Sequence, residues 1–276
     1  MQTYAGHPAQ IQYNDAAVVS TFVGDSFDWA PVKAGTNHSI WALPNLQDPA
    51  EATSNSQRSA DGAFSWYAWP TDGGNSIISG PMTKIWDDRF ISDLGNATYM
   101  AQTNPKTEDY GESHYIRPYS AAHSEDGSSE WASGFSHDAW RDLYKPYIQA
   151  YKAGASSPTI DTEEIVYWYR ITPKGVTCTN DTLPAPNGID LLSDSVFVAT
   201  MLKEAATLIV TSGGNEAVSI DVPAGITTSN VTMGVGKQSF VVSRGGQTVL
   251  NGTGELSIVD TCETYNYNLY VGSVKA

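Results

Sequence analysis

The pattern of short apolar segments changes near residue 158, and this change divides the chain into two kinds of structure. Before it, short runs rich in β-branched and aromatic residues alternate with segments of helical periodicity. After it, short strand-like runs follow one another, with frequent turn signals and no long helix. We therefore predict an α/β domain over residues 1–157 and an all-β domain over residues 158–276.

The first part contains four runs that are typical of strands, each bounded by Gly, Pro, Asp or Asn. They are residues 17–23, 38–43, 63–69 and 98–102. A helix is predicted over residues 81–95, which start with Pro and end with Gly. Its apolar face would hold Met82, Ile85, Trp86 and Phe90. This alternation implies parallel strands with helices outside them, in a barrel or an open sheet.

A second predicted helix ends the first part. Its apolar residues recur at helical spacing: Trp140, Leu143, Tyr144, Tyr147, Ile148 and Tyr151. Ser136 is the expected N-cap, Pro146 the expected kink and Gly154 the expected stop.

The second part is predicted to be an antiparallel β-sandwich. Gly245-Gly246 lies between two apolar runs and indicates a hairpin. A bridge between Cys178 and Cys262 would tie the first and last strands together, with a contribution of about 4 kcal/mol on the chain-entropy model. Two free buried thiols are the alternative.

The charge of the chain limits its partners. With 30 acidic and 15 basic residues the net charge is −15, which disfavours binding to phosphate backbones and to anionic lipid. We therefore expect no nucleic acid and no membrane as partner. The 8 Trp and 15 Tyr suit a neutral sugar, because flat aromatic faces stack on pyranose rings, although core packing explains many such rings equally well.

Five N-x-S/T sequons and an even number of cysteines favour a secreted, extracellular protein. The sequons are Asn37, Asn96, Asn180, Asn230 and Asn251. The first ten residues, MQTYAGHPAQ, lack the basic start and apolar region of a signal peptide. No apolar run reaches the roughly 18 residues that a membrane span needs.

Residues 108–118, EDYGESHYIRP, combine three carboxylates and a histidine around one glycine. Asp109 and Glu112 could act as acid and base in glycosidic cleavage if the segment follows a barrel strand, and His114 could tune either one. An inverting pair needs roughly 6.5–9.5 Å between its carboxyl groups. The D-x-x-E spacing alone is a weak signal, since a solvated helix N-terminus has the same pattern.

Several motifs in register make the chain resemble a known family. They are HPAQIQYND, VVSTFVGDSFDW, DGAFSWYAWP, DYGESHYI, HDAWRDLYKPYIQAYKAG, IVYWYR and YNYNLYVGS, in that order. The chain resembles the fungal α-1,3-glucanases of glycoside hydrolase family 71, the mutanases, along nearly its full length. The resemblance implies hydrolysis of α-1,3-glucan with inversion and without metal or cofactor, and Asp109 and Glu112 as the catalytic carboxylates.

Five further residues in these motifs are predicted to bind substrate: Asp25, Asp61, Trp66, Trp69 and His114. Asp25 follows a strand and would face the cleft, although a turn-forming Asp is equally compatible. Trp66 and Trp69 lie near a strand end and could stack on sugar, with barrel core as the alternative.

The chain also departs from the family pattern. The first three β/α units of the family, and a segment near residues 103–108, have no counterpart in it. We therefore expect an incomplete (β/α)8 TIM-type barrel followed by the sandwich, acting as a monomer on α-1,3-glucan. The alternatives are a glucan-binding remnant without catalytic activity and a faulty gene model.

Overall fold

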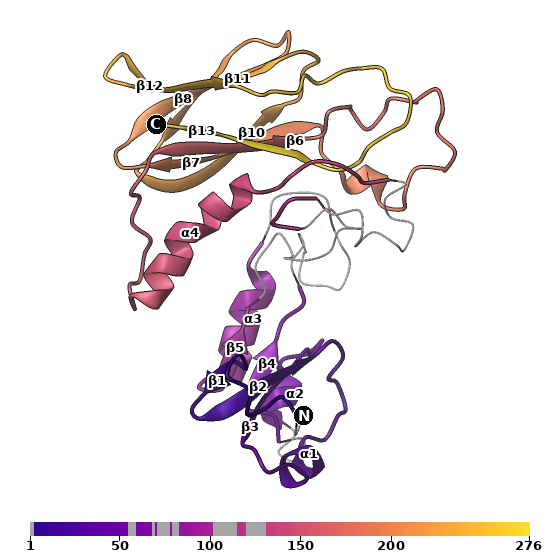
Figure 1. Cartoon of the computed structure of the whole chain (residues 1–276), viewed down its shortest axis with the longest axis vertical. Helices are drawn as coiled ribbons and strands as arrows, with labels where there is room; N and C mark the ends of the chain where they lie inside the picture. The colour runs from indigo at the N-terminus through magenta and orange to yellow at the C-terminus, as the bar shows by residue number, and fades with distance from the viewer. Residues whose placement is uncertain are drawn as a thin grey trace. The chain divides into compact units, whose positions relative to one another are not determined.

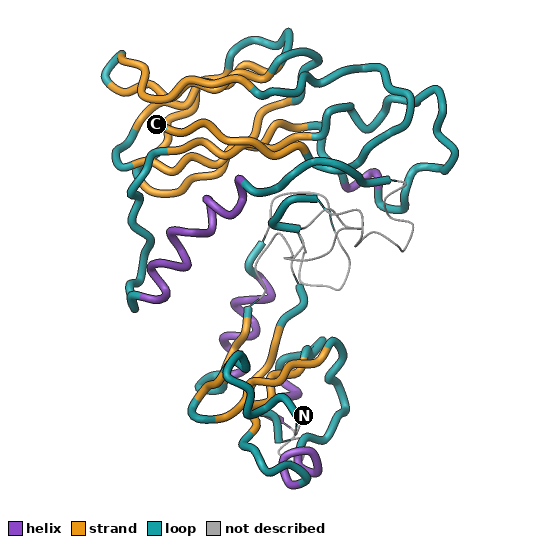
Figure 2. The backbone as a smooth tube through the Cα atoms, in the orientation of Figure 1, coloured by secondary structure: helices purple, strands orange, loops and turns teal. Residues whose placement is uncertain are grey.

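The computed structural model describes residues 3–54, 59–67, 70, 78, 83–101, 115–119 and 131–276. The chain forms two compact units, Met1–Lys106 and Thr107–Ala276 (Figures 1 and 2). This division lies earlier than the predicted boundary at 157/158. The reason is that helix α4 (Ala139–Lys152) packs within the second unit, where Trp140 shares a hydrophobic cluster with Val166 and Val271.

Parallel strands form the centre of the first unit. β2 (Ala16–Thr21) pairs parallel with β3 (Ile40–Pro44), and β4 (Gly62–Phe64) pairs parallel with β5 (Thr98–Met100). A parallel bridge between Asn45 and Phe64 links β3 to β4, and the short β1 (Gln12–Tyr13) adds antiparallel to β2. The predicted parallel arrangement is confirmed for these four segments, although each strand is shorter than the run that indicated it.

Among the residues that the structure describes, three short helices lie between these strands in the chain. They are α1 (Ala30–Ala34), α2 (Ala50–Ser54) and α3 (Ile85–Leu94). Helix α3 buries Trp86, Phe90 and Leu94, which are four residues apart and so share one face. Its predicted face included Ile85, which is wrong because Ile85 is 43% exposed. The helix ends as predicted at Gly95, whose φ of +56° favours glycine; Met82 lies outside the described residues.

The second unit contains two four-stranded antiparallel sheets, in the orders β10-β7-β6-β13 and β12-β11-β8-β9. Their strands are β6 (Glu164–Tyr169), β7 (Ser195–Leu202), β8 (Ala206–Ser212), β9 (Val218–Val222), β10 (Gly225–Thr232), β11 (Gln238–Arg244), β12 (Gln247–Thr253) and β13 (Tyr270–Lys275). Side chains of both sheets, among them Tyr167, Val198, Leu208 and Phe240, form one hydrophobic cluster.

The turn and the disulfide of this unit agree with the sequence pattern. Gly245 and Gly246 have φ of +58° and +78° and join β11 to β12, as the hairpin signal predicted. Cys178 and Cys262 form a disulfide with a Cα–Cα distance of 4.8 Å. Cys178 follows β6 and Cys262 precedes β13, and these two strands are paired directly.

Helix α4 differs from its prediction. Trp140 is buried, but Tyr147, Ile148 and Tyr151 are 48%, 51% and 87% exposed, so only the start of the predicted apolar face is covered. The N-cap is Asp138 rather than Ser136, whose hydroxyl instead donates to the Asp138 carboxylate (2.7 Å). In the described ranges, no helix is long and apolar enough to cross a membrane.

Candidate functional site

The carboxyl ends of the parallel strands in the first unit carry two of the predicted substrate residues. Asp25 lies in the segment that follows β2, and Trp66 lies just beyond the last residue of β4. In parallel α/β folds, the loops at this edge hold binding and catalytic groups. The structure therefore places Asp25 and Trp66 at the same edge of the parallel strands.

Aromatic rings cluster around Trp66 at this edge. The Trp66 ring meets Phe22 edge-on at a centroid distance of 5.1 Å and Phe64 at 5.5 Å. Phe22 is 69% exposed and Trp66 is only partly buried. The cluster is therefore a surface feature of the strand ends, and flat aromatic surfaces of this kind can stack on sugar rings.

Asp25 holds two strand-end segments together. Its Oδ1 accepts a hydrogen bond from the backbone N–H of Gln47 (3.0 Å), and Asn45 Nδ2 donates to Phe22 O (2.6 Å). A Cβ at Gly24 would lie 2.3 Å from Cβ of Pro44, so the close approach of these segments requires glycine. The Asp25 side chain is partly exposed beside the aromatic cluster.

Asp61 lies at the other end of β4 from Trp66. Its Oδ2 accepts hydrogen bonds from Lys33 Nζ (2.6 Å) and from Ala42 N (2.7 Å). These contacts tie α1 and β3 to the start of β4. This structural role explains why the position holds an acidic residue. Substrate binding by Asp61 stays a prediction.

The predicted catalytic pair, Asp109 and Glu112, lies outside the described residues, as do His114 and Trp69. Tyr115, which directly follows His114, is fully buried. The Tyr115 hydroxyl donates to Phe135 O and accepts from Asn268 Nδ2 (2.7 Å), and its ring stacks on His137 with centroids 3.9 Å apart. The chain is thus anchored in the second unit just beyond the acidic stretch.

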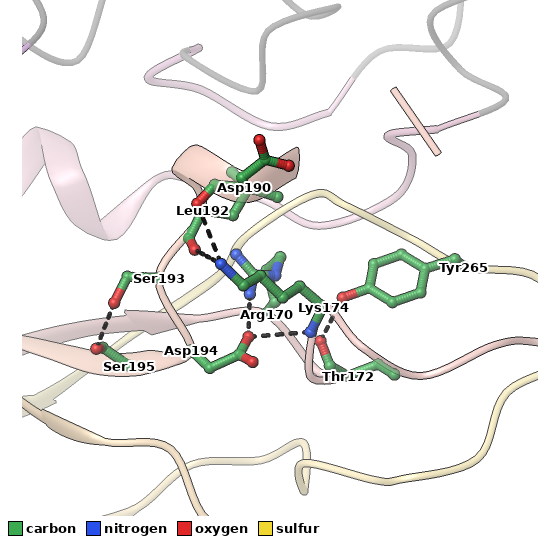
Figure 3. Close-up of polar contacts among 9 residues, drawn as sticks. All are labelled: Arg170, Thr172, Lys174, Asp190, Leu192, Ser193, Asp194, Ser195 and Tyr265. Atoms are coloured by element: carbon green, nitrogen blue, oxygen red, sulfur yellow. Dashed lines mark hydrogen bonds and ion pairs between the residues drawn. The ribbon is translucent and has the colours of Figure 1, made fainter. Parts of the chain in front are cut away.

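A second group of polar side chains lies in the second unit, where β6 ends and β7 begins (Figure 3). Buried Arg170 donates to the carboxylate of Asp194, which also accepts from Lys174 N (3.0 Å). Lys174 Nζ donates to the carbonyls of Asp190 (3.1 Å) and Leu192 (2.7 Å). Arg170 is 4% exposed, so this ion pair is structural.

Tyr265 adjoins this group. Its hydroxyl donates to Thr172 O (2.6 Å), and burial raises the pKa of Tyr265, so the hydroxyl stays protonated at neutral pH. Lys174 and Tyr265 both line a pocket of about 290 Å³, together with Trp131, Asp181 and Tyr267. We did not predict this pocket from the sequence. The one feature of the sequence that could have indicated it is the high aromatic content of YNYNLYVGS, which includes Tyr265 and Tyr267. Among described residues, no group of three or more His, Cys, Asp or Glu could hold a metal.

Comparisons with a family model and with known proteins point to the same family of glycosyl hydrolases. The model of glycosyl hydrolase family 71 matches residues 1–107 and 108–276. A mutanase of Penicillium rubens is 59% identical over 100% of this chain and 70% of its own length. A glucan endo-1,3-alpha-glucosidase of Schizosaccharomyces pombe is 33% identical over 99% of this chain and 74% of its own length. No solved structure matches.

The alignments also differ in length from this chain. The alignment with the Penicillium protein extends over 312 positions, whereas the chain has 276 residues. The relative therefore contains residues without a counterpart here. The two segments matched by the family model meet between residues 107 and 108, directly before the acidic stretch.

Proposed function

Because the chain belongs to glycosyl hydrolase family 71, we propose that it hydrolyses the α-1,3-glucosidic bonds of glucan. The observation that carries the proposal is the match to the Penicillium mutanase over the whole chain. The Schizosaccharomyces relative, named a glucan endo-1,3-alpha-glucosidase, supports the same substrate.

Two carboxyl groups would perform the reaction, and we assign them to Asp109 and Glu112. One is held protonated and gives its proton to the leaving glucosidic oxygen. The other is ionised and takes a proton from water, which attacks the anomeric carbon from the opposite side and inverts it. The assignment follows from the DYGES motif, in which the two acids are three residues apart.

The substrate would lie against the edge where the parallel strands end. Trp66 would offer a ring face to a glucosyl unit, with Asp25 at the same strand edge and Trp69 later in the same motif. His114, in the DYGESHYI motif, is a further substrate residue that we propose. The parallel strands of the first unit suit part of a (β/α)8 barrel, and the two antiparallel sheets of the second unit suit a sandwich. The disulfide and the sequons favour an extracellular site of action.

The test is the release of reducing sugar from insoluble α-1,3-glucan by the purified chain. Asp109→Asn and Glu112→Gln should each lower the rate by at least about a hundredfold, because general acid–base catalysis contributes that much. Asp260→Asn, at an exposed position of the second unit, is a control with the same loss of charge and should keep the wild-type rate.

Co-sedimentation of the same variants with the glucan separates hydrolysis from binding. Catalytic variants that bind glucan but release no sugar are the result expected of an enzyme. A wild-type chain that binds glucan without cleaving it would instead identify a binding remnant. Hydrolysis that survives both substitutions would contradict the assignment of Asp109 and Glu112.

A further inference from the structure

The pocket beside the Arg170 ion pair has aromatic walls. Tyr265 and Tyr267 have ring centroids 4.0 Å apart, and Trp131 lines the same pocket. Trp131 Nε1 donates to Pro184 O (3.1 Å), and its backbone carbonyl accepts from Tyr267 N (2.7 Å). These two bonds hold Trp131 in place, and the indole N–H uses the edge of its ring rather than a face.

Small polar groups complete the lining. The hydroxyls of Thr177, Thr182 and Thr264 can each donate and accept a hydrogen bond. Asp181 uses Oδ1 to accept from Tyr265 N (2.8 Å), and a carboxylate has a second oxygen that can accept from a ligand hydroxyl. Aromatic faces with a few placed hydroxyl and carboxylate groups are the chemistry that recognises a sugar ring.

The charges around the pocket favour a neutral ligand. The ammonium of Lys174 is engaged by the carbonyls of Asp190 and Leu192, and Arg170 is paired with Asp194 (Figure 3). The positive charges of Lys174 and Arg170 are therefore already engaged within the protein and do not favour an anionic ligand. The exposed Asp181 carboxylate and the net charge of −15 repel anions as well.

The two walls of the pocket are joined covalently. Cys178 lies in the wall that contains Thr177 and Asp181, and Cys262 directly precedes the wall that contains Thr264. Backbone hydrogen bonds from Thr179 N and Asn180 N reach across to residues 262 and 263 (3.1 and 2.7 Å). The pocket is therefore largely preformed, which lowers the entropy lost when a ligand binds.

We propose that this pocket is a carbohydrate-binding site that takes a single glucosyl unit of a glucan chain. Its volume of about 290 Å³ lies near the lower limit of ligand pockets and suits one sugar unit rather than a long segment. That the polymer is α-1,3-glucan rests on the proposed function, whereas binding of a neutral sugar does not. The sequon at Asn180 adjoins the pocket, so a second source of the same chemistry is a glycan on the chain itself.

The test uses the full chain carrying Asp109→Asn, made in a bacterial host that adds no N-glycans. A soluble α-1,3-linked gluco-oligosaccharide should slow hydrogen exchange over residues 174–185 and 262–268. Trp131→Ala should weaken the binding measured through this protection by about tenfold. Tyr151→Ala removes an aromatic side chain that is 87% exposed on α4 of the same unit, and it should leave the binding unchanged.

Gly175→Leu keeps the result interpretable if Trp131→Ala disturbs the fold. A Cβ at Gly175 meets no atom within 4 Å, so the larger side chain would narrow the pocket without a clash at Cβ, and it should weaken binding similarly. The proposal would be overturned if both Gly175→Leu and Trp131→Ala bound the oligosaccharide with wild-type affinity. It would also be overturned if the oligosaccharide did not protect residues 174–185 and 262–268. If the pocket binds sugar but the unsubstituted chain hydrolyses no glucan, the pocket proposal holds and the proposed hydrolytic function is wrong.

Chain from a glycosylating host distinguishes the two sources of sugar. Equal protection by the oligosaccharide in both preparations supports the polymer as ligand. Protection that is lost in the glycosylated chain and restored by Asn180→Gln shows that its own glycan fills the pocket. That result would support the proposal that the pocket binds sugar and would identify the glycan on Asn180 as the sugar that occupies it.

Discussion

The two units of this protein organise their strands in different ways. In the second unit β7 and β10 pair antiparallel through eight residues, whereas in the first unit β4 and β5 pair parallel through three. Antiparallel neighbours can be joined by a tight turn such as Gly245-Gly246, while each parallel pair needs a crossover. In the second unit such short turns join β8 to β9 and β11 to β12, whereas β6 and β13 also pair antiparallel although they are distant in the chain. The second unit therefore combines local and distant pairings, and the parallel pairs of the first unit all need a crossover.

The units also differ in what they leave exposed. In the described part of the second unit outside α4, exposed large apolar side chains such as Val218 and Val235 reach only 43% and 46%. In the first unit Phe22 and Val23, which directly follow β2, are 69% and 68% exposed. Exposed apolar surface at strand ends is typical of a binding surface.

Removing the disulfide should have the largest effect and should show whether the second unit is as self-contained as this comparison indicates. Cys178→Ser with Cys262→Ser opens a loop of sequence separation 84, and we expect the free energy of unfolding of the second unit to fall by about 4 kcal/mol. Denaturation followed by hydrogen exchange should locate the loss in residues 131–276. Equal loss of protection in residues 3–101 would mean that the two units unfold together.

Gly62→Ala tests the first unit at its shortest parallel pairing. A Cβ at Gly62 would lie 1.9 Å from the backbone oxygen of Thr98, its partner on β5, so the strands must separate. We expect a loss of about 2 kcal/mol, confined to β4 and β5. Gly214→Ala is the control in the second unit, because a Cβ there meets nothing within 4 Å. Unchanged exchange rates at residues 62–64 and 98–100 would contradict the expected strand separation.

The smallest effect concerns two neighbouring acids in the second unit. Arg244 Nη2 lies 2.8 Å from Glu163 Oε1, and this hydrogen bond holds the pKa of Glu163 below its ordinary 4.5. Burial raises the pKa of Glu164, an effect that the nearby Lys275 opposes and Asp142 reinforces. Folding therefore stabilises the ionised form of Glu163 and destabilises the ionised form of Glu164.

Opposite pH dependences follow. Glu163→Gln should lower the unfolding free energy by about 1 kcal/mol at pH 7, and the difference should shrink as the pH falls from 4.5 through the lowered pKa. Glu164→Gln should raise the unfolding free energy slightly at pH 7, and its effect should vanish as the pH falls through the raised pKa to below 4.5. Denaturant titrations of both variants at pH 7 and pH 3 check this, and effects of the same sign at pH 7 would refute the assignment.

Several local features could be predicted from the sequence because short-range physics controls them. The helix stop at Gly95 and the Gly245-Gly246 hairpin each follow from residues within one element or turn. The parallel pairing of β2 with β3 followed instead from the alternation of strands and helices along the chain. The extent of the apolar face of α4 could not be predicted in this way. Helical spacing shows which residues share a face, but the neighbouring elements decide how much of that face is covered.

The sequence alone determined the succession of strand and helix segments along the chain and the family motifs, because both are local properties of the residues. It predicted the Cys178–Cys262 bridge, and the structure decided it against two free thiols. Only the tertiary structure decided that Asp61 is bonded to Lys33 and Ala42 while Trp66 lies at the opposite end of the same strand. It also brought Trp131, Lys174 and Tyr267 around one pocket. The physical reason is distance along the chain: contacts between residues far apart depend on how the strands pair, and no local pattern encodes them.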